Sequence, residues 1–376
     1  MSEQVEIAAL LHAEATTDEP PSSVLDVKRA MSVGRRQRRY GRAACAGLVV
    51  AVLAAGAVTV PRVLPARGTA GYDVAGLPAV SALPTMSGDV APPSFDPLKL
   101  YLKFGWVPGR YDQRSYEVGA TGQGMMAVLM AYPVVGHDWQ GVSVTLYPRG
   151  VTPPPPQRLV GRATVTRTIP ASVNGQDANW TVYSGATIPE AFLDWRYAPQ
   201  GWARIQVTDA NADVADIAVR VAEKLQVSTT TSVTVPFRVG ALPSGLRRVS
   251  TSINSSTQSD DSPWYAEMAF SAGRTEQQRE DERLIVNATA YRDQDRVGGK
   301  GFDTPNTTID GHPTSQIPPS GPTSDLTVYH IGLMNLEVEA STLGVAGLLG
   351  PEGCRSVYPR LNPVPGNASS VISQLG

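Results

Sequence analysis

Few residues of this chain combine the types and the spacing that catalysis needs. His137 is followed by Asp138, the pair that a general base and its orienting carboxylate would use. Adjacent residues of a strand point to opposite faces of a sheet, so these two side chains would not cooperate there, and we expect them in a loop. The sequence contains no Gly-x-Ser-x-Gly, Ser-x-x-Lys or His-Glu-x-x-His motif and no phosphate-binding Gly-Lys-Ser/Thr. It predicts no catalytic residue, and we expect the protein not to be an enzyme.

One acidic segment imitates a calcium site. Asp209, Asn211 and Asp213 alternate as in the first half of a calcium-binding loop. Such a loop needs glycine at its sixth position, where Val214 stands, and a bidentate glutamate at its twelfth, where Arg220 stands. We interpret the segment as the cap of a following helix and predict neither a metal nor a cofactor.

Tryptophans are the remaining candidates for a ligand site. Aromatic rings can line a groove, but in small sheets they more often fill the core, and we interpret most of them as core residues. The six are Trp106, Trp139, Trp180, Trp195, Trp202 and Trp264.

The elements that would position these residues are short strands. Segments rich in β-branched and aromatic residues alternate with Gly, Pro and Asn turns, and each predicts a strand. Asn174-Gly175 and Asp310-Gly311 favour two-residue hairpins, because both central residues of a type I′ turn have positive φ. The predicted strands are 125–132, 142–147, 163–168 and 178–183, followed by 265–271, 284–291, 326–330 and 336–340.

The strands form two series that repeat after roughly 135 residues. Three pairs of segments match, and they come in the same order in both series. The pairs are Phe104-Gly-Trp-Val-Pro-Gly with Val239-Gly-Ala-Leu-Pro-Ser-Gly, Val173-Asn-Gly-Gln with Ile309-Asp-Gly-His, and Trp180-Thr-Val-Tyr with Leu326-Thr-Val-Tyr. The sequence therefore predicts two copies of one domain, residues 98–232 and 233–365.

A helix is predicted to close each copy. Apolar residues recur at i, i+3, i+4 and i+7 from Val214 to Leu225, behind the cap residue Asn211. The second copy has a weaker equivalent over 343–358, which Gly347 and Gly350 interrupt. We therefore predict an α+β fold with two tandem antiparallel-sheet domains, each with a closing helix.

The segment from Ala43 to Val60 is uncharged and lies between Arg42 and Arg62. As a helix it would extend about 27 Å, close to the ~30 Å hydrocarbon core of a bilayer. The sequence thus predicts one transmembrane helix over 43–60, with the lipid bilayer as its partner. A cleaved signal peptide, a lipoprotein anchored at Cys45 and a buried helix of a soluble protein are the alternatives.

Flanking arginines predict the orientation. Five of them lie from Gly34 to Arg42, whereas only Arg62 and Arg67 follow the apolar segment closely, so the positive-inside rule puts the N-terminus in the cytoplasm. Residues 1–42 are then a cytoplasmic tail that could bind a cytoplasmic protein. Repeated prolines predict an extended linker over 61–97, and residues 366–376 form a C-terminal tail. The domains between them would lie outside the cell membrane.

Charge and cysteine content exclude two further classes. The formal net charge is −2, so the chain has no strong positive field, and we expect no nucleic-acid partner. The chain has two cysteines, and because Cys45 would lie in the membrane, Cys354 has no partner for an intrachain disulfide. The exterior part must be stabilised by its apolar core.

The N-terminal region resembles uncharacterised single-pass membrane proteins of actinobacteria. The features shared are the arginine-rich GRRQRRYGR segment, one apolar span and a proline-rich spacer. The strand-rich unit with Trp195, Gly201-Trp202 and the helix at 214–225 is also similar to the exterior domains of membrane-bound sigma-factor regulators and to lipoprotein-carrier folds. The resemblance implies a curved sheet and carries no catalytic residue over to this chain.

Two functions agree with these observations. The first is a membrane-anchored, non-enzymatic binding or sensing protein of the cell envelope, whose exterior domains bind a ligand and whose tail signals to a cytoplasmic partner. The alternative is an envelope carrier or scaffold that holds an apolar ligand in a curved sheet, which requires a deep apolar pocket in at least one copy.

Overall fold

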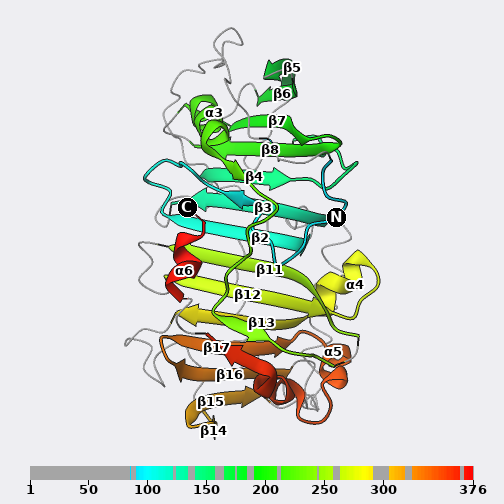
Figure 1. Ribbon diagram of the computed structural model, residues 1–376, viewed down its shortest axis with the longest axis vertical. Coiled ribbons are helices and arrows are strands. Elements are labelled where there is room, and N and C mark those ends of the chain that lie inside the picture. Colours follow the sequence, from blue (N-terminus) through cyan, green and yellow to red (C-terminus); the bar gives the residue numbers. More distant parts are fainter. Residues whose placement is uncertain are drawn as a thin grey trace, which may run out of the picture. The chain divides into compact units, whose positions relative to one another are not determined.

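Hydrogen bonds between neighbouring strands join most of the described chain into one antiparallel sheet of 14 strands (Figure 1). The computed structural model describes residues 85, 90–121, 124–133, 140–156, 165–173, 176–183, 190–209, 213–243, 245–256, 263–290, 305–317, 324–364 and 368–375.

The first half of the sheet follows the chain from β2 to β8. Its spatial order is β2-β3-β4-β8-β7-β6-β5, so the last strand of the series returns to lie beside the third. The strands are β2 (Gln113–Thr121), β3 (Gly124–Tyr132), β4 (Gly141–Leu146), β5 (Val165–Val173), β6 (Gln176–Tyr183), β7 (Glu190–Ala198) and β8 (Gly201–Thr208).

The second half repeats this order as β11-β12-β13-β17-β16-β15-β14. The two halves meet at β2 and β11, where Tyr116 pairs with Ile253. The strands are β11 (Arg247–Ser256), β12 (Trp264–Ser271), β13 (Leu284–Ala290), β14 (Thr307–Ile309), β15 (His312–Ile317), β16 (Ser324–Ile331) and β17 (Met334–Ala340).

Each half is also bounded by a pair of short strands. β1 (Leu102–Lys103) enters the first half and pairs with β9 (Gln226–Val227), which leaves it. β10 (Phe237–Val239) and β18 (Leu361–Pro363) do the same for the second half. Both pairings are antiparallel, so the beginning and the end of each series are held together.

The helix of the first half agrees with the prediction. α3 (Val214–Lys224) is capped by the Asp213 side chain, which accepts hydrogen bonds from two backbone amides of the first turn. The predicted cap residue, Asn211, lies outside the described residues. The other helices are α4 (Glu276–Asp281), α5 (Leu343–Leu348) and α6 (Ala368–Ser373), with 3₁₀ turns η3 (Gly353–Ser356) and η4 (Tyr358–Arg360).

The second closing helix is broken into α5, η3 and η4. Gly350 follows α5 with a φ of 79°, a value that residues with a side chain rarely adopt, and Pro351 cannot donate a helical hydrogen bond. The charged run 274–283 contains α4, which begins with a capping box between Thr275 and Gln278.

The core lies on one face of the sheet. Tyr116, Ile253, Ala266, Ala288 and Leu336 succeed one another across five neighbouring strands, and each is at most 1 % exposed. α3, α6 and the connecting segments lie in front of the strands in Figure 1. Val371 of α6 and Leu375, which follows this helix, are fully buried, although both were predicted to belong to a C-terminal tail.

The predicted fold class is wrong. The strands of the two series form one continuous sheet and one large hydrophobic cluster, not two domains each with its own sheet and closing helix. β2 and β11 join the two series because each offers an edge to the other, and they pair antiparallel from Ser250 opposite Gly119 to Ser256 opposite Gln113. The boundaries at 98–232 and 233–365 stay predictions.

The transmembrane helix of that fold class has no counterpart in the part of the chain that the structure describes. Among the described residues, no helix has the length and the apolar composition needed to cross a bilayer. The predicted segment Ala43–Val60, the tail 1–42 and most of the linker 61–97 lie outside the described residues. The end of that linker is packed onto the sheet, since Ala91 and Phe95 are at most 1 % exposed.

Candidate functional site

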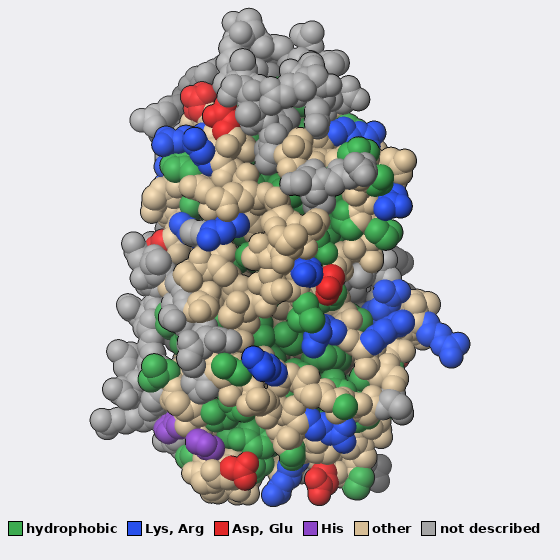
Figure 2. Space-filling model, in the orientation of Figure 1, with side chains coloured by type: hydrophobic (Ala, Val, Ile, Leu, Met, Phe, Trp, Pro, Cys, Tyr) green, Lys and Arg blue, Asp and Glu red, His purple; other side chains and the backbone are tan. Residues whose placement is uncertain are grey.

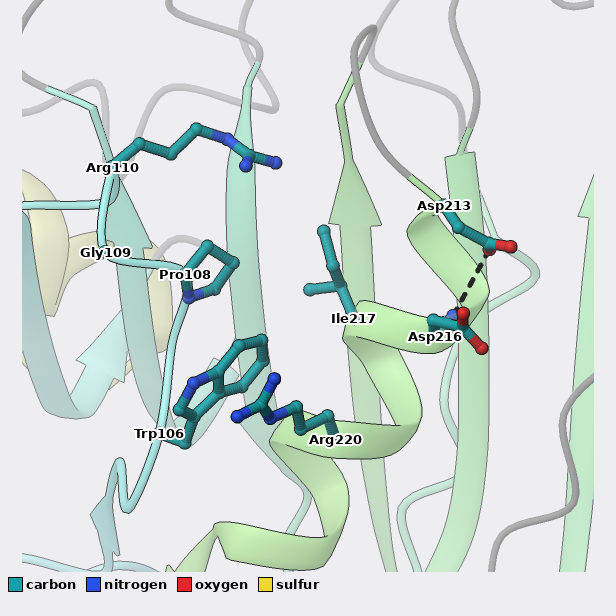
Figure 3. Close-up of a pocket in the computed structure, with 8 residues that line it drawn as sticks. All are labelled: Trp106, Pro108, Gly109, Arg110, Asp213, Asp216, Ile217 and Arg220. Carbon is teal, nitrogen blue, oxygen red and sulfur yellow. Dashed lines mark hydrogen bonds between the residues drawn. The ribbon is translucent and has the colours of Figure 1, made fainter.

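A groove lies between the turn that follows β1 and helix α3. We call residues 104–111 the entry turn. The cavity has a volume of about 430 Å³. Four of its residues come from the entry turn and four from the segment that begins α3, as Figure 3 shows: Trp106, Pro108, Gly109 and Arg110, then Asp213, Asp216, Ile217 and Arg220. We refer to these eight residues as the Trp106 groove.

The amphipathic sequence of α3 holds one wall of the groove. Val214, Ala218, Val221 and Ala222 are at most 1 % exposed and pack into the core. The opposite side of the helix carries Asp216 and Arg220, which are exposed. Asp213 stabilises the first turn by accepting hydrogen bonds from Ala215 N at 3.0 Å and Asp216 N at 3.3 Å.

The entry turn is placed directly against the end of this helix. A Cβ atom at Gly105 would lie 2.1 Å from the carbonyl oxygen of Lys224, a distance that no side chain tolerates. Glycine is therefore needed here for the close approach of two backbones. The antiparallel pairing of Lys103 with Gln226 fixes the same contact from the neighbouring residues.

A buried carboxylate fastens the other end of the turn. Asp209 is fully buried and accepts a hydrogen bond from Arg110 Nε at 3.0 Å and one from the Tyr111 hydroxyl at 2.5 Å. Arg110 also donates from Nη2, which makes an ion pair. Burial raises the pKa of Tyr111, and its hydrogen bond to Asp209 raises it further, so the phenol stays protonated and donates.

The floor of the groove is apolar. Pro108 and Ile217 are buried, and Trp106 is half-buried. The guanidinium carbon of Arg220 lies 4.1 Å from the centre of the Trp106 ring, within the range of a cation–π contact. Arg110, whose side chain is 47 % exposed, projects over the opposite end of this floor (Figure 3).

Two carboxylates occupy the outer side of the groove. In Figure 3 the Asp213 and Asp216 carboxylates point away from Pro108 and Trp106, whereas the two guanidinium groups border the space between turn and helix. Figure 2 shows acidic and basic side chains close together on the surface over α3. The interior of the groove therefore offers hydrogen-bond donors and an apolar floor.

The residues singled out in the sequence are distributed as follows. Asp209 fastens the entry turn, and Asp213 caps α3, although the capping interpretation named Asn211 as the cap residue. Trp180, Trp195 and Trp264 are core residues, each at most 5 % exposed, and Trp202 stacks against Arg196 at 4.0 Å. Trp139 and the His137-Asp138 pair lie outside the described residues.

The sequence did not distinguish the residues of this groove. Trp106 was one of six tryptophans, but its neighbours Gly105, Pro108 and Gly109 are turn residues and not strand residues. A tryptophan in a turn has no sheet face to fill, and this was the available signal. No sequence signal marked Arg110 and Arg220 as neighbours, because they are 110 positions apart in the chain.

Comparison with known proteins gives weak likenesses only. No known protein family matches the chain, and no curated protein matches it. Among solved structures, the chain is similar to MucB in complex with MucA(peri), with 14 % identity, a TM-score of 0.20, and coverage of 67 % of this chain and 92 % of that chain. It is also similar to the Pseudomonas aeruginosa MucA/MucB complex, with 13 % identity, a TM-score of 0.21, and coverage of 70 % and 93 %. TM-scores this low do not establish a shared site.

Proposed function

We propose that this chain is a non-enzymatic binding protein of the cell envelope that recognises a partner polypeptide in the Trp106 groove. The observation that carries the proposal is the composition of the groove: an apolar floor of Pro108 and Ile217, an aromatic wall, and exposed guanidinium groups at its ends. Aromatic and arginine side chains are the residues that most often dominate protein recognition.

The alternative, a carrier of an apolar ligand, has less support. A carrier needs an enclosed apolar cavity, whereas the core of this protein is filled by side chains such as Trp195, Tyr197 and Phe237, all fully buried. The Trp106 groove is open and bordered by charged groups. Its shape suits an extended segment of polypeptide better than an acyl chain.

Photo-crosslinking in the cells that make the protein tests this function. A benzoylphenylalanine at Gly109 would lie in the groove, where a Cβ meets nothing within 4 Å. The matched control is the same residue at Gly347, which is exposed, has equally open surroundings and lies in the second half. We expect a defined protein adduct from position 109 that is absent from position 347.

A second variant makes the result specific. Trp106→Ala removes the aromatic wall, so the adduct from position 109 should fall at least about tenfold if the groove binds the partner. Adducts of equal yield from both positions, or an adduct unaffected by Trp106→Ala, would show that the groove is not the binding site.

A further inference from the structure

The guanidinium group of Arg220 is held in place without being neutralised. It stacks on Trp106 at 4.1 Å, and the part of the chain that the structure describes gives it no ion pair. A guanidinium that lies over an aromatic ring keeps the N–H groups at its edge free, and they can bind a carboxylate with two parallel hydrogen bonds. Arg220 is therefore oriented for an anionic group that the described residues do not supply.

Arg110 offers a second donor at the other end of the floor. Its Nε and Nη2 atoms bind Asp209, and with nearly half of the side chain exposed, Nη1 remains available to the solvent side. Asp209 fixes the direction of this guanidinium but also compensates its charge. We expect Arg110 to contribute hydrogen bonds and Arg220 to contribute most of the electrostatic attraction.

The second half of the sheet shows that these features are not needed for the fold. Its entry turn has Ala241 where the first half has Trp106. Arg360 Nη1, from η4, donates a hydrogen bond to the Ala241 carbonyl oxygen at 2.6 Å, so an arginine beside this turn binds its backbone. The same topology thus forms with and without an aromatic–arginine pair.

From these contacts we infer that the groove selects an acidic peptide segment in which one apolar side chain lies between two carboxylates. The apolar side chain packs on Pro108 and Ile217, one carboxylate binds Arg220 and the other approaches Arg110. This inference rests on the proposed function and specifies its ligand. The carboxylates of Asp213 and Asp216 point away from the floor.

Synthetic peptides test the charge pattern directly. The probe is acetyl-Gly-Glu-Gly-Leu-Gly-Glu-Gly-amide with a fluorescent label, and its binding to the full-length protein is followed by fluorescence anisotropy. Matched peptides replace both Glu residues by Gln or by Lys, or Leu by Gly. We expect the Glu peptide to bind at least about tenfold more tightly than each of the three others.

Protein variants assign the binding to the groove. Arg220→Gln should weaken binding of the Glu peptide about tenfold or more, and Arg220→Lys should restore only part of it, because lysine cannot stack and bind bidentately at once. Arg238→Gln, an exposed arginine of β10, removes the same charge elsewhere and should leave the affinity unchanged. Circular dichroism of each variant checks that the fold is retained.

Several results would overturn the inference. These are equal affinity for the Glu and Gln peptides, equal effects of Arg220→Gln and Arg238→Gln, or displacement of the peptide by laurate at a lower concentration than by unlabelled peptide, which would indicate an amphiphile site. If crosslinking at position 109 still depends on Trp106 in these cases, the proposed function stands and only its ligand class is wrong. If that crosslinking fails, the function itself is wrong.

Discussion

At the residue scale, the surroundings of a side chain decide its role. Asp209 and Asp213 are four positions apart in one acidic segment. Asp209 is fully buried and binds Arg110 and Tyr111, whereas Asp213 is exposed and caps α3. The two carboxylates therefore position the two walls of the groove, one from each side.

Glu267 on β12 provides a test at this scale. Burial raises the pKa of its carboxyl, and the nearby charge of Glu337 raises it further, against a hydrogen bond from Tyr265 and the charge of Arg283 that lower it. The folded protein then binds a proton more strongly than the unfolded chain. The free energy of unfolding must fall as the pH rises above the ordinary carboxyl range, until the folded state also loses the proton.

We predict that Glu267→Gln removes this contribution to the pH dependence. The free energy of unfolding of the variant minus that of the native protein should be larger at pH 7 than at pH 4. Urea unfolding across that range measures this difference. Glu352→Gln, which removes an exposed carboxylate, is the control and should keep the native slope. A Glu267→Gln variant with the native pH dependence would contradict the argument.

At the scale of elements, close backbone contacts fix the positions of the entry turns against the helical segments. The entry turns pack against the ends of α3 and η4 through Gly105 and Gly240. The outer strands limit the sheet: β14 has only three residues, and β5 contains Pro170, opposite Asn179. Val173 and Gln176 close the hairpin between β5 and β6, and hydrogen-bonded pairs alternate with non-bonded pairs from there. The backbone nitrogen of position 170 therefore points away from β6, toward the open edge of the sheet. Because proline has no N–H group, it removes a hydrogen-bond donor from that edge.

Substitutions of the two glycines should have unequal effects. A Cβ at Gly105 would lie 2.1 Å from a backbone oxygen, but at Gly240 the nearest atom, Arg360 O, is 3.1 Å away. We expect Gly105→Ala to lower the free energy of unfolding by about 1–3 kcal/mol and Gly240→Ala by less than about 1 kcal/mol. Urea unfolding measures both values.

Gly109→Ala is the control for these two variants, since an added Cβ there meets nothing within 4 Å and the stability should change by less than about 0.5 kcal/mol. If Gly105→Ala were no more destabilising than Gly109→Ala, the entry turn would not be packed against α3 as described.

At the scale of the whole described region, the two series of strands share one core. Tyr116 of the first half pairs with Ile253 of the second, and both are fully buried. α6 packs on β11 and β12, and the side chain of Gln374, which follows this helix, binds the backbone of Thr234 at 2.8 and 2.7 Å. The C-terminal segment thus ties the connector between the halves to the sheet.

We therefore predict that the halves unfold together. Ile253→Ala should cost about 2–5 kcal/mol, because it opens a cavity at the contact between the halves, and should shift one cooperative urea transition seen by circular dichroism and tryptophan fluorescence. Hydrogen exchange should increase in β3 and β12 alike. Ser252→Ala, on the opposite face, should change stability far less, and two separate transitions would contradict a common core.

Local sequence patterns predicted much of what the structure contains. The period of α3, the Asp310-Gly311 hairpin and the strands at β3, β4, β12 and β13 follow from side-chain spacing and turn chemistry, which act within a few residues. The matched pair 180–183 and 326–329 was misaligned, since these segments lie in β6 and β16, which hold different places in the strand order. Short β-rich segments resemble one another too closely to specify which strands correspond.

The amino-acid sequence by itself determined where strands, hairpins and the first closing helix form, because these depend on local backbone preferences and on the period of apolar residues. Only the tertiary structure decided that β2 and β11 join two series into one sheet, and that Trp106, Arg110 and Arg220 border one groove. Strand pairing and the meeting of distant side chains depend on contacts between residues far apart in the chain, and local patterns do not record them.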